Sequence, residues 1–290
     1  MKKPILTALF ALFALMTSCA KTGEAITIDE IAAANTEDQL FSRHAAFSIN
    51  TVYYDADKNE TFSTYQAIGK SGDQYAAAYE DADGYTEYLD AGTVYYFDPS
   101  AGEYTVLAFY PGMLDEYVAS YGDYLFLSNE GSVIGAASTS GGETKVDVTL
   151  TRSDVNAPFL DSLGFGSPDG IRVAYSLDAK TKEVRGYELY AVKGDTESLV
   201  LKTSVSALDA PPPAPDYVAQ LKNPAETRTI TVVAPDGTQT QYVVAKDAMF
   251  TMSFPEQYGA YLDAQGTTPV AEEDLRGKDA TIYLIDQSAA

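Results

Sequence analysis

Hydrophobic and polar residues alternate along most of the chain between residues 46 and 208. Successive side chains of a β-strand point to opposite faces, so a period of two predicts strands. Nearly every gap holds Gly, Asp, Asn or Ser, which suit tight turns, and the pattern therefore predicts an antiparallel meander. Two breaks, at 112–121 and 153–164, can form short helices or loops. The predicted strands cover residues 46–54, 61–70, 74–80, 85–89, 93–98, 103–110, 123–128, 132–138, 143–151, 170–178, 184–192 and 197–208.

A helical pattern precedes the meander. Thr27 and Glu30 have the spacing of a capping box, in which each side chain accepts a hydrogen bond from the other residue's backbone. Ile28 and Ile31 then follow at helical spacing. We expect an amphipathic helix here, and it is one candidate cover for the sheet.

A proline-rich run, APPPAP at 210–215, ends the meander. Such a run cannot continue a helix or a central strand, and it predicts a stiff linker or strap over residues 210–225. Beyond it, Asp236 and Gly237 are a strong hairpin signal. Further strands are predicted at 226–235, 238–246, 249–252, 258–262 and 280–285. We interpret 27–209 as the main domain and 226–290 as a small β module, close to the lower size limit for a domain that folds alone.

The central hairpin, GTVYYFDPSAGEYTVLAFYP at 92–111, is apolar on both faces. Val94 and Tyr96 point one way, whereas Tyr95 and Phe97 point the other way. An antiparallel sheet usually has one polar face, as the alternation at 143–151 illustrates. Both faces of the hairpin must therefore be covered by a helix, by the curl of a long sheet, or by a bound apolar molecule. Plain core packing is the simplest interpretation.

Large apolar side chains of the central strands are the candidates for contact with such a molecule. The candidate ligand-binding residues are Tyr95, Tyr96, Phe97, Phe109, Tyr110 and Phe126.

The N-terminus has the pattern of an export signal. Lys2 and Lys3 precede an apolar run at 5–15, which is shorter than the ~20 residues that a membrane-spanning helix needs. The following MTSC sequence resembles a bacterial lipobox, which implies acylation of Cys19 and removal of residues 1–18. Residues 19–26 would then be a tether. An ordinary signal peptide followed by a chance cysteine is the alternative.

Composition narrows the classes of function. The 42 acidic and 19 basic residues give a formal charge of −23, which disfavours a nucleic-acid partner. A single cysteine cannot form a disulfide within its own chain, so the fold must depend on burial, for which 46% hydrophobic residues suffice. We expect the acyl anchor to hold the protein outside the cytoplasm, on the bacterial cell membrane or the outer membrane.

Motifs for catalysis are missing, and we expect neither an enzyme nor a cofactor. His44 is the only histidine, and its place after the predicted helix is typical of a helix end. No zinc site of the usual Cys/His kind, P-loop or G-x-S-x-G elbow can be assembled. The turns 55–59 and 81–84 are rich in Asp but lack parts of a calcium loop, so we predict hairpin turns and no metal site.

The segment DAGTVYYFDPSAGEYTVLAF resembles the central strands of the LolA/LolB superfamily of lipoprotein carriers. Asp90, Gly92, Tyr96, Asp98 and Pro99 match the family pattern, although tyrosine replaces its tryptophan. The run SVSALDAPPPAP also resembles the closing strand and strap of that family. The likeness covers about 27–215. It implies a mainly β, α+β fold: a curled antiparallel half-barrel with an N-terminal helix, whose concave face takes up acyl chains.

Three functional hypotheses follow. The first is an anchored lipoprotein that binds a lipid, an acyl chain or a lipoprotein's acyl group in the half-barrel. The second is a structural or sensing lipoprotein with a plugged core, whose C-terminal module contacts an envelope protein. The third is a hydrolase that uses a pair of carboxylates in a cleft, which nothing in the sequence requires.

Overall fold

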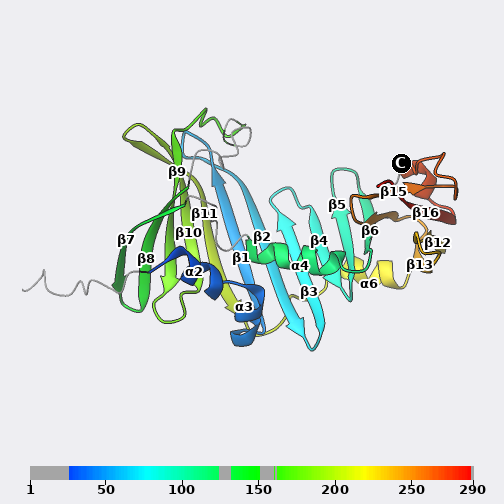
Figure 1. Cartoon of the computed structure of the whole chain (residues 1–290), viewed down its shortest axis with the longest axis horizontal. Coiled ribbons are helices and arrows are strands. Elements are labelled where there is room, and N and C mark those ends of the chain that lie inside the picture. The colour runs from blue at the N-terminus through cyan, green and yellow to red at the C-terminus, as the bar shows by residue number, and fades with distance from the viewer. Residues whose placement is uncertain (1–25, 124–131, 151–159, 161, 289–290) are drawn as a thin grey trace, which may run out of the picture. The chain divides into compact units, whose positions relative to one another are not determined.

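The computed structural model describes residues 26–123, 132–150, 160 and 162–288. It is mainly β, with 52% strand and 14% helix, and it contains a large curled antiparallel sheet and a smaller second sheet. Figure 1 shows the order of the elements along the chain. The fold class predicted from the sequence is confirmed.

Among the described residues, the large sheet has twelve strands in the order β14-β6-β5-β4-β3-β2-β1-β11-β10-β9-β8-β7, and it is open because its end strands β14 and β7 do not pair with each other. Neighbouring strands from β2 to β6 and from β7 to β11 pair antiparallel. These strands are β1 Ala46–Tyr54, β2 Glu60–Ser71, β3 Gln74–Asp81, β4 Thr86–Asp90, β5 Thr93–Asp98, β6 Glu103–Phe109, β7 Val133–Ser140, β8 Glu143–Leu150, β9 Gly170–Asp178, β10 Val184–Lys193 and β11 Thr196–Leu208.

The second sheet has four strands in the order β13-β12-β16-β15. They are β12 Thr227–Val233, β13 Gln239–Ala245, β15 Tyr258–Tyr261 and β16 Ala280–Asp286. The strand between them in sequence, β14 Met249–Ser253, instead pairs parallel with β6 of the large sheet. A short 3-10 helix, η2 Glu272–Leu275, precedes β16.

The chain folds into two compact units, which we describe separately. Unit 1 contains Met1–Arg43, Thr51–Phe62 and Gly122–Ser206, and unit 2 contains His44–Asn50, Ser63–Tyr121 and Ala207–Ala290. Each unit gathers segments that are far apart in sequence. The domain boundaries expected near residues 210 and 226 stay predictions.

In unit 1 the N-terminal segment covers one face of β8–β10. Two short helices, α2 Ile28–Ala34 and α3 Glu37–Arg43, replace the single predicted helix, and Thr27 and Glu30 form the predicted capping box. Ile31 lies fully buried in a cluster with Val148 and Val173. The opposite side chains of β8 are half-buried or exposed, so β8 has the predicted dry and wet faces.

Asn35, the residue after α2, joins this helix to the start of β10. Its buried amide nitrogen donates to the carbonyl oxygens of Ile31 and Lys182 at 2.7 and 3.1 Å, and its side-chain oxygen accepts from the Val184 N–H at 2.8 Å. These bonds satisfy carbonyl and amide groups that would otherwise be buried without partners.

In unit 2 two further helices lie on β2–β6. The predicted break after β6 forms α4 Met113–Asp123, which runs across the strands in Figure 1. The predicted strap is extended only to Pro215, because α6 Asp216–Lys222 follows it. This helix was not predicted, although Val218 and Leu221, its buried residues, are three positions apart and Asp216 and Lys222 suit its two ends.

Candidate functional site

The central hairpin has the predicted strands and one clear register. Tyr95 lies opposite Val106, and Phe97 lies opposite Tyr104. Between them, Tyr96 lies opposite Thr105 and faces the other side of the sheet. The chain itself supplies a cover for each face.

We call one side of β2–β6 the α4 face. A row of apolar residues runs across it through directly paired positions, and the first four are buried: Ile68, Ala77, Leu89, Val94 and Leu107. Helix α4 lies on this face, because the Tyr117 ring packs 5.3 Å from the Phe109 ring. Several large side chains on this face remain only half-buried, among them Tyr79, Tyr96 and Leu107.

A second row on the α4 face places Glu87 between Tyr79 and Tyr96 of the neighbouring strands. The carboxylate accepts hydrogen bonds from the hydroxyls of Tyr85 at 3.0 Å and Tyr117 at 3.3 Å. Burial raises the pKa of Glu87, and the two tyrosine hydroxyls oppose that rise only in part. Burial and the nearby Glu87 raise the pKa of Tyr85 as well. The row therefore places a carboxyl group whose pKa is raised by burial beside an apolar surface.

We call the other side of these strands the α6 face. The strap and α6 are held there by the Tyr88 hydroxyl, which donates to the Pro212 carbonyl at 2.9 Å, and by the Tyr217 hydroxyl, which donates to the Tyr95 carbonyl at 3.1 Å. Lys222 forms an ion pair with Asp90 at 2.5 Å. The second sheet covers more of this face, because Val106 of β6 belongs to one buried cluster with residues of β12, β13 and β16.

The predicted candidates are divided between the two faces. Tyr96 and Phe109 lie on the α4 face. Tyr95 and Phe97 lie on the α6 face, where the Phe97 ring packs 4.9 Å from Tyr104 and 6.2 Å from Tyr217. Phe126 and Cys19 lie outside the described residues.

Tyr110, the remaining candidate, follows β6. Its ring packs 5.4 Å from that of Tyr258, against the buried cluster that joins β6 to the second sheet. Successive residues of a strand point to opposite faces, so neighbouring aromatic residues such as Tyr95 and Tyr96 cannot share one face. The sequence therefore identified the aromatic residues but did not show which of them lie together.

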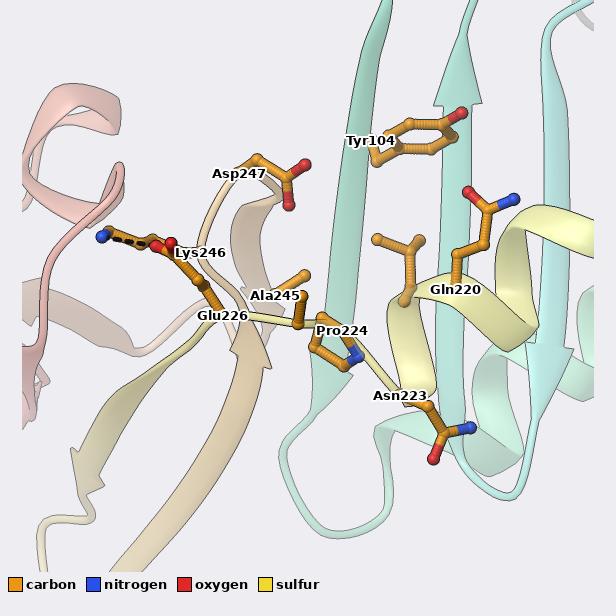
Figure 2. Close-up of a pocket in the computed structure, with 10 residues that line it drawn as sticks. Tyr104, Gln220, Asn223, Pro224, Glu226, Ala245, Lys246 and Asp247 are labelled. Carbon is orange, nitrogen blue, oxygen red and sulfur yellow. Dashed lines mark hydrogen bonds and ion pairs between the residues drawn. The ribbon is translucent and has the colours of Figure 1, made fainter.

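A pocket of about 560 Å³ opens beside the C-terminal end of α6. Figure 2 shows Tyr104 and Gln220 on one wall and Asp247 on the opposite wall, with Pro224 and Ala245 between them. Lys246 is held by Glu226 at 2.7 Å. The pocket thus combines an aromatic ring, an amide and a carboxylate around a small apolar floor.

A smaller pocket of about 310 Å³ is also lined by Leu221. The α6 face contributes Thr93, Tyr95 and Val106, and β13 contributes residues 241–244. Both pockets border the same two elements, α6 and β13. Sequence reasoning missed them because α6 and the position of β13 were not predicted.

In the acidic turns that resemble calcium loops, the Asp side chains accept hydrogen bonds from backbone N–H groups. Asp55 accepts from the backbone N–H of Asn59, and Asp81 accepts from those of Asp83 and Tyr85, at 2.8 to 3.0 Å. Among the described residues, no group of three or more His, Cys, Asp or Glu side chains could hold a metal ion. These loops therefore have the geometry of the predicted turns.

No family model and no curated protein matches the sequence. Among the solved structures that resemble the fold are three at 12% identity. The structure of LprF from Mycobacterium bovis has a TM-score of 0.34 and covers 67% of this chain and 99% of its own. The structure of MucB has a TM-score of 0.32, with coverages of 66% and 60%. A structure described as an outer membrane lipoprotein-sorting protein domain, from Vibrio parahaemolyticus, has a TM-score of 0.27, with coverages of 63% and 89%.

At this level of identity the likeness concerns the fold, and it assigns no function.

Proposed function

We propose that this protein is an extracytoplasmic lipoprotein that binds an apolar ligand, a lipid or an acyl chain, on the α4 face. The observation that carries the proposal is the incomplete cover of that face by the described residues. Within them, α4, a helix of 11 residues, lies against Phe109 and Glu87, whereas the apolar row is drawn from five strands. Tyr79, Tyr96, Leu107 and Phe109 stay half-buried beside it.

A group of half-buried aromatic residues is unusual on a surface that contacts only water. Burial of apolar area contributes roughly 25 cal/mol per Å², so an unfinished apolar face favours a further apolar layer. An acyl chain is such a layer, and it needs no charged partner from the protein. Tyr96 and Phe109, two of the residues predicted from the sequence, would line the site.

The anchor is the second part of the proposal. Acylation of Cys19 would hold the protein on a membrane through the tether 19–26. Among the described residues, no helix is long and apolar enough to cross a bilayer. Two or more acyl chains on one cysteine give stable attachment, whereas a single chain gives only marginal binding.

Mass spectrometry tests both parts. Protein purified from membranes in mild detergent should carry lipid in native spectra, and its N-terminal peptide should have the mass of acylated Cys19. Protein stripped of lipid should raise the fluorescence of a hydrophobic probe. Leu107→Glu should reduce that probe binding several-fold, because it places a carboxylate on the half-buried end of the apolar row.

Val243→Glu is the matched control, since Val243 is apolar and 69% exposed but lies on β13, away from the α4 face. Circular dichroism should show that both variants keep the fold. Equal probe binding by the two variants, or lipid-free spectra of the membrane-extracted protein, would exclude a ligand on the α4 face.

A protein-binding function is the second candidate. It is favoured by the intramolecular covers themselves, because α4 lies on one face of the hairpin and α6 with the strap lies on the other. In that case the sheet would serve as a scaffold, and a partner would bind elsewhere on unit 2.

A further inference from the structure

Strand β13 is an edge strand of the second sheet. Helix α6 contacts it, but no strand pairs with its outer side among the described residues. Strand β13 is the last strand of the second sheet and pairs only with β12 in the described part of the chain. The Ala234 N–H donates to the Thr238 carbonyl, and the Lys246 N–H donates to the Glu226 carbonyl. These two bonds, one at each end of the β12–β13 pair, fix which residues of β13 hydrogen-bond to β12. Every second residue of β13 therefore directs its N–H and C=O groups away from β12, namely Gln239, Gln241 and Val243. None of these outward groups has a partner among the described residues.

The other three edges have features that protect them in the described part of the chain. Strand β7 has a register shift between Ile134 and Ala137, and such an irregularity twists an edge away from a new partner. Residues beside Pro269 pair with β15, through bonds from Val270 to Ala260 and from Leu262 to Thr268. The short helix η2 lies against β14, which forms one edge of the large sheet. Soluble proteins usually guard open edges with charges, prolines or bulges. The sequence of β13, QTQYVVA, contains no charge and no proline.

The side chains of β13 fit an added strand. Val243 is 69% exposed, and an apolar residue of an added strand would pack beside it as a cross-strand pair. The glutamines at 239 and 241 are exposed and can hydrogen-bond to polar side chains of such a strand. The two pockets beside Leu221 border residues 241–247 and offer room for alternate side chains (Figure 2).

The charges around β13 favour a basic segment. Two exposed lysines near β13 are already paired, Lys246 with Glu226 and Lys222 with Asp90. Asp236 and Asp247 stand at the two ends of β13 and form no ion pair within the described residues. The net charge of −23 adds a general attraction for cations.

We propose that β13 binds an extended, basic peptide segment by strand addition, with main-chain bonds to residues 239, 241 and 243. In this binding mode the backbone supplies affinity and alternate side-chain pockets supply selectivity. The inference does not depend on the apolar ligand of the α4 face. It names the surface that a protein-binding function of unit 2 would use.

The test uses the full chain and a defined probe, a fluorescein-labelled nine-residue peptide in which valine alternates with lysine and threonine. Fluorescence anisotropy should show saturable binding. The same peptide with N-methyl groups on alternate residues should bind about tenfold more weakly, because it keeps the side chains but loses the edge bonds. A version with glutamate in place of lysine should also bind more weakly, and this difference should shrink as salt is added.

Two variants locate the site. Gln241→Pro removes an outward N–H without removing a bond to β12, and Val243→Lys adds a charge and deletes the apolar contact. Both should weaken the lysine peptide about tenfold. Val133→Lys is the matched control, because Val133 is 62% exposed and lies on β7, an edge strand of the large sheet. It adds the same charge and should leave binding unchanged.

Hydrogen exchange provides a readout that does not depend on the variants. The lysine peptide should slow exchange of the amides of residues 239, 241 and 243, and urea unfolding should confirm that Gln241→Pro is folded. The proposal is wrong if the N-methylated peptide binds equally well, if the protected amides lie outside β13, or if the unmodified peptide does not bind.

Discussion

Glu87 shows how one residue can connect the stability of the fold to pH. Its carboxylate lies on the α4 face, where Tyr85 and Tyr117 donate to it and the rings of Tyr79 and Tyr96 occupy the paired positions on either side. No basic residue contributes to its pKa shift, so burial raises the pKa of Glu87. The folded state therefore holds the proton of Glu87 more tightly than the unfolded state does.

The sign of the pH dependence follows. Below the range in which an ordinary glutamate titrates, Glu87 is protonated in both states and costs nothing. As pH rises through that range, the unfolded state releases its proton first, and the folded protein loses stability until the folded-state pKa is passed. Glu87→Gln should therefore match the wild type in acid and become more stable than the wild type at neutral pH. Urea unfolding at a series of pH values measures this difference.

Glu80→Gln is the control for that series. Glu80 is exposed on β3, so its replacement should change the free energy of unfolding by less than about 0.5 kcal/mol at each pH. If Glu87→Gln were less stable than the wild type at neutral pH, the hydrogen bonds to the ionised carboxylate would outweigh its burial.

At the scale of elements, the strap depends on a glycine in β2. A Cβ atom added to Gly69 would lie 2.6 Å from the Cα atom of Pro211 and 2.8 Å from the Cβ atom of Ala46. Only glycine lets the strap approach the strand this closely. The strap in turn holds Tyr88 through the Pro212 carbonyl.

Gly69→Ala should therefore destabilise the protein by about 1–3 kcal/mol, the usual cost of overpacking. Gly170→Ala is the matched control, because Gly170 is also in a strand and an added Cβ would meet nothing within 4 Å. That substitution should be neutral or stabilise by up to about 1 kcal/mol. Thermal or urea unfolding of the two variants distinguishes them, and equal stabilities would mean that the strap shifts without cost.

Elements with a strong local pattern were predictable, whereas their partners were not. The bounds of β5 match the predicted 93–98, because alternation and turn residues are local signals. Helix α6 was not predicted because the proline run before it suggested an extended strap as far as residue 225. The pairing of β14 with β6 joins residues more than 140 positions apart, and no local pattern encodes such a contact.

The same limit applies to the candidate site. The alternation of Tyr95, Tyr96 and Phe97 predicted two covered faces, and both covers exist. Which helix covers which face depends on the path of the chain after β6 and after Pro215. That path is fixed by tertiary contacts, such as the Tyr217 hydroxyl with the Tyr95 carbonyl, which a single sequence does not show.

At the scale of the whole molecule, sequence order and compact units do not coincide. Unit 2 is assembled from three separate segments, and its last segment begins at Ala207. Residues beyond the strap supply most of the buried core cluster of unit 2, including Ile230, Val232 and Phe250, which pack with Val106 and Ala108 of β6. The part of unit 2 beyond the strap therefore buries part of the large sheet as well as its own strands.

Truncation after residue 225 tests this dependence. The shortened chain would lose β14, expose the edge of β6 and uncover Val106 and Ala108, which are 6% and 1% exposed in the full chain. We expect its free energy of unfolding to fall by at least about 3 kcal/mol, comparable with a severe core substitution, and its binding of a hydrophobic dye to increase. A chain of unchanged stability, together with a folded fragment 226–290, would instead make the module an independent domain with its boundary at the strap.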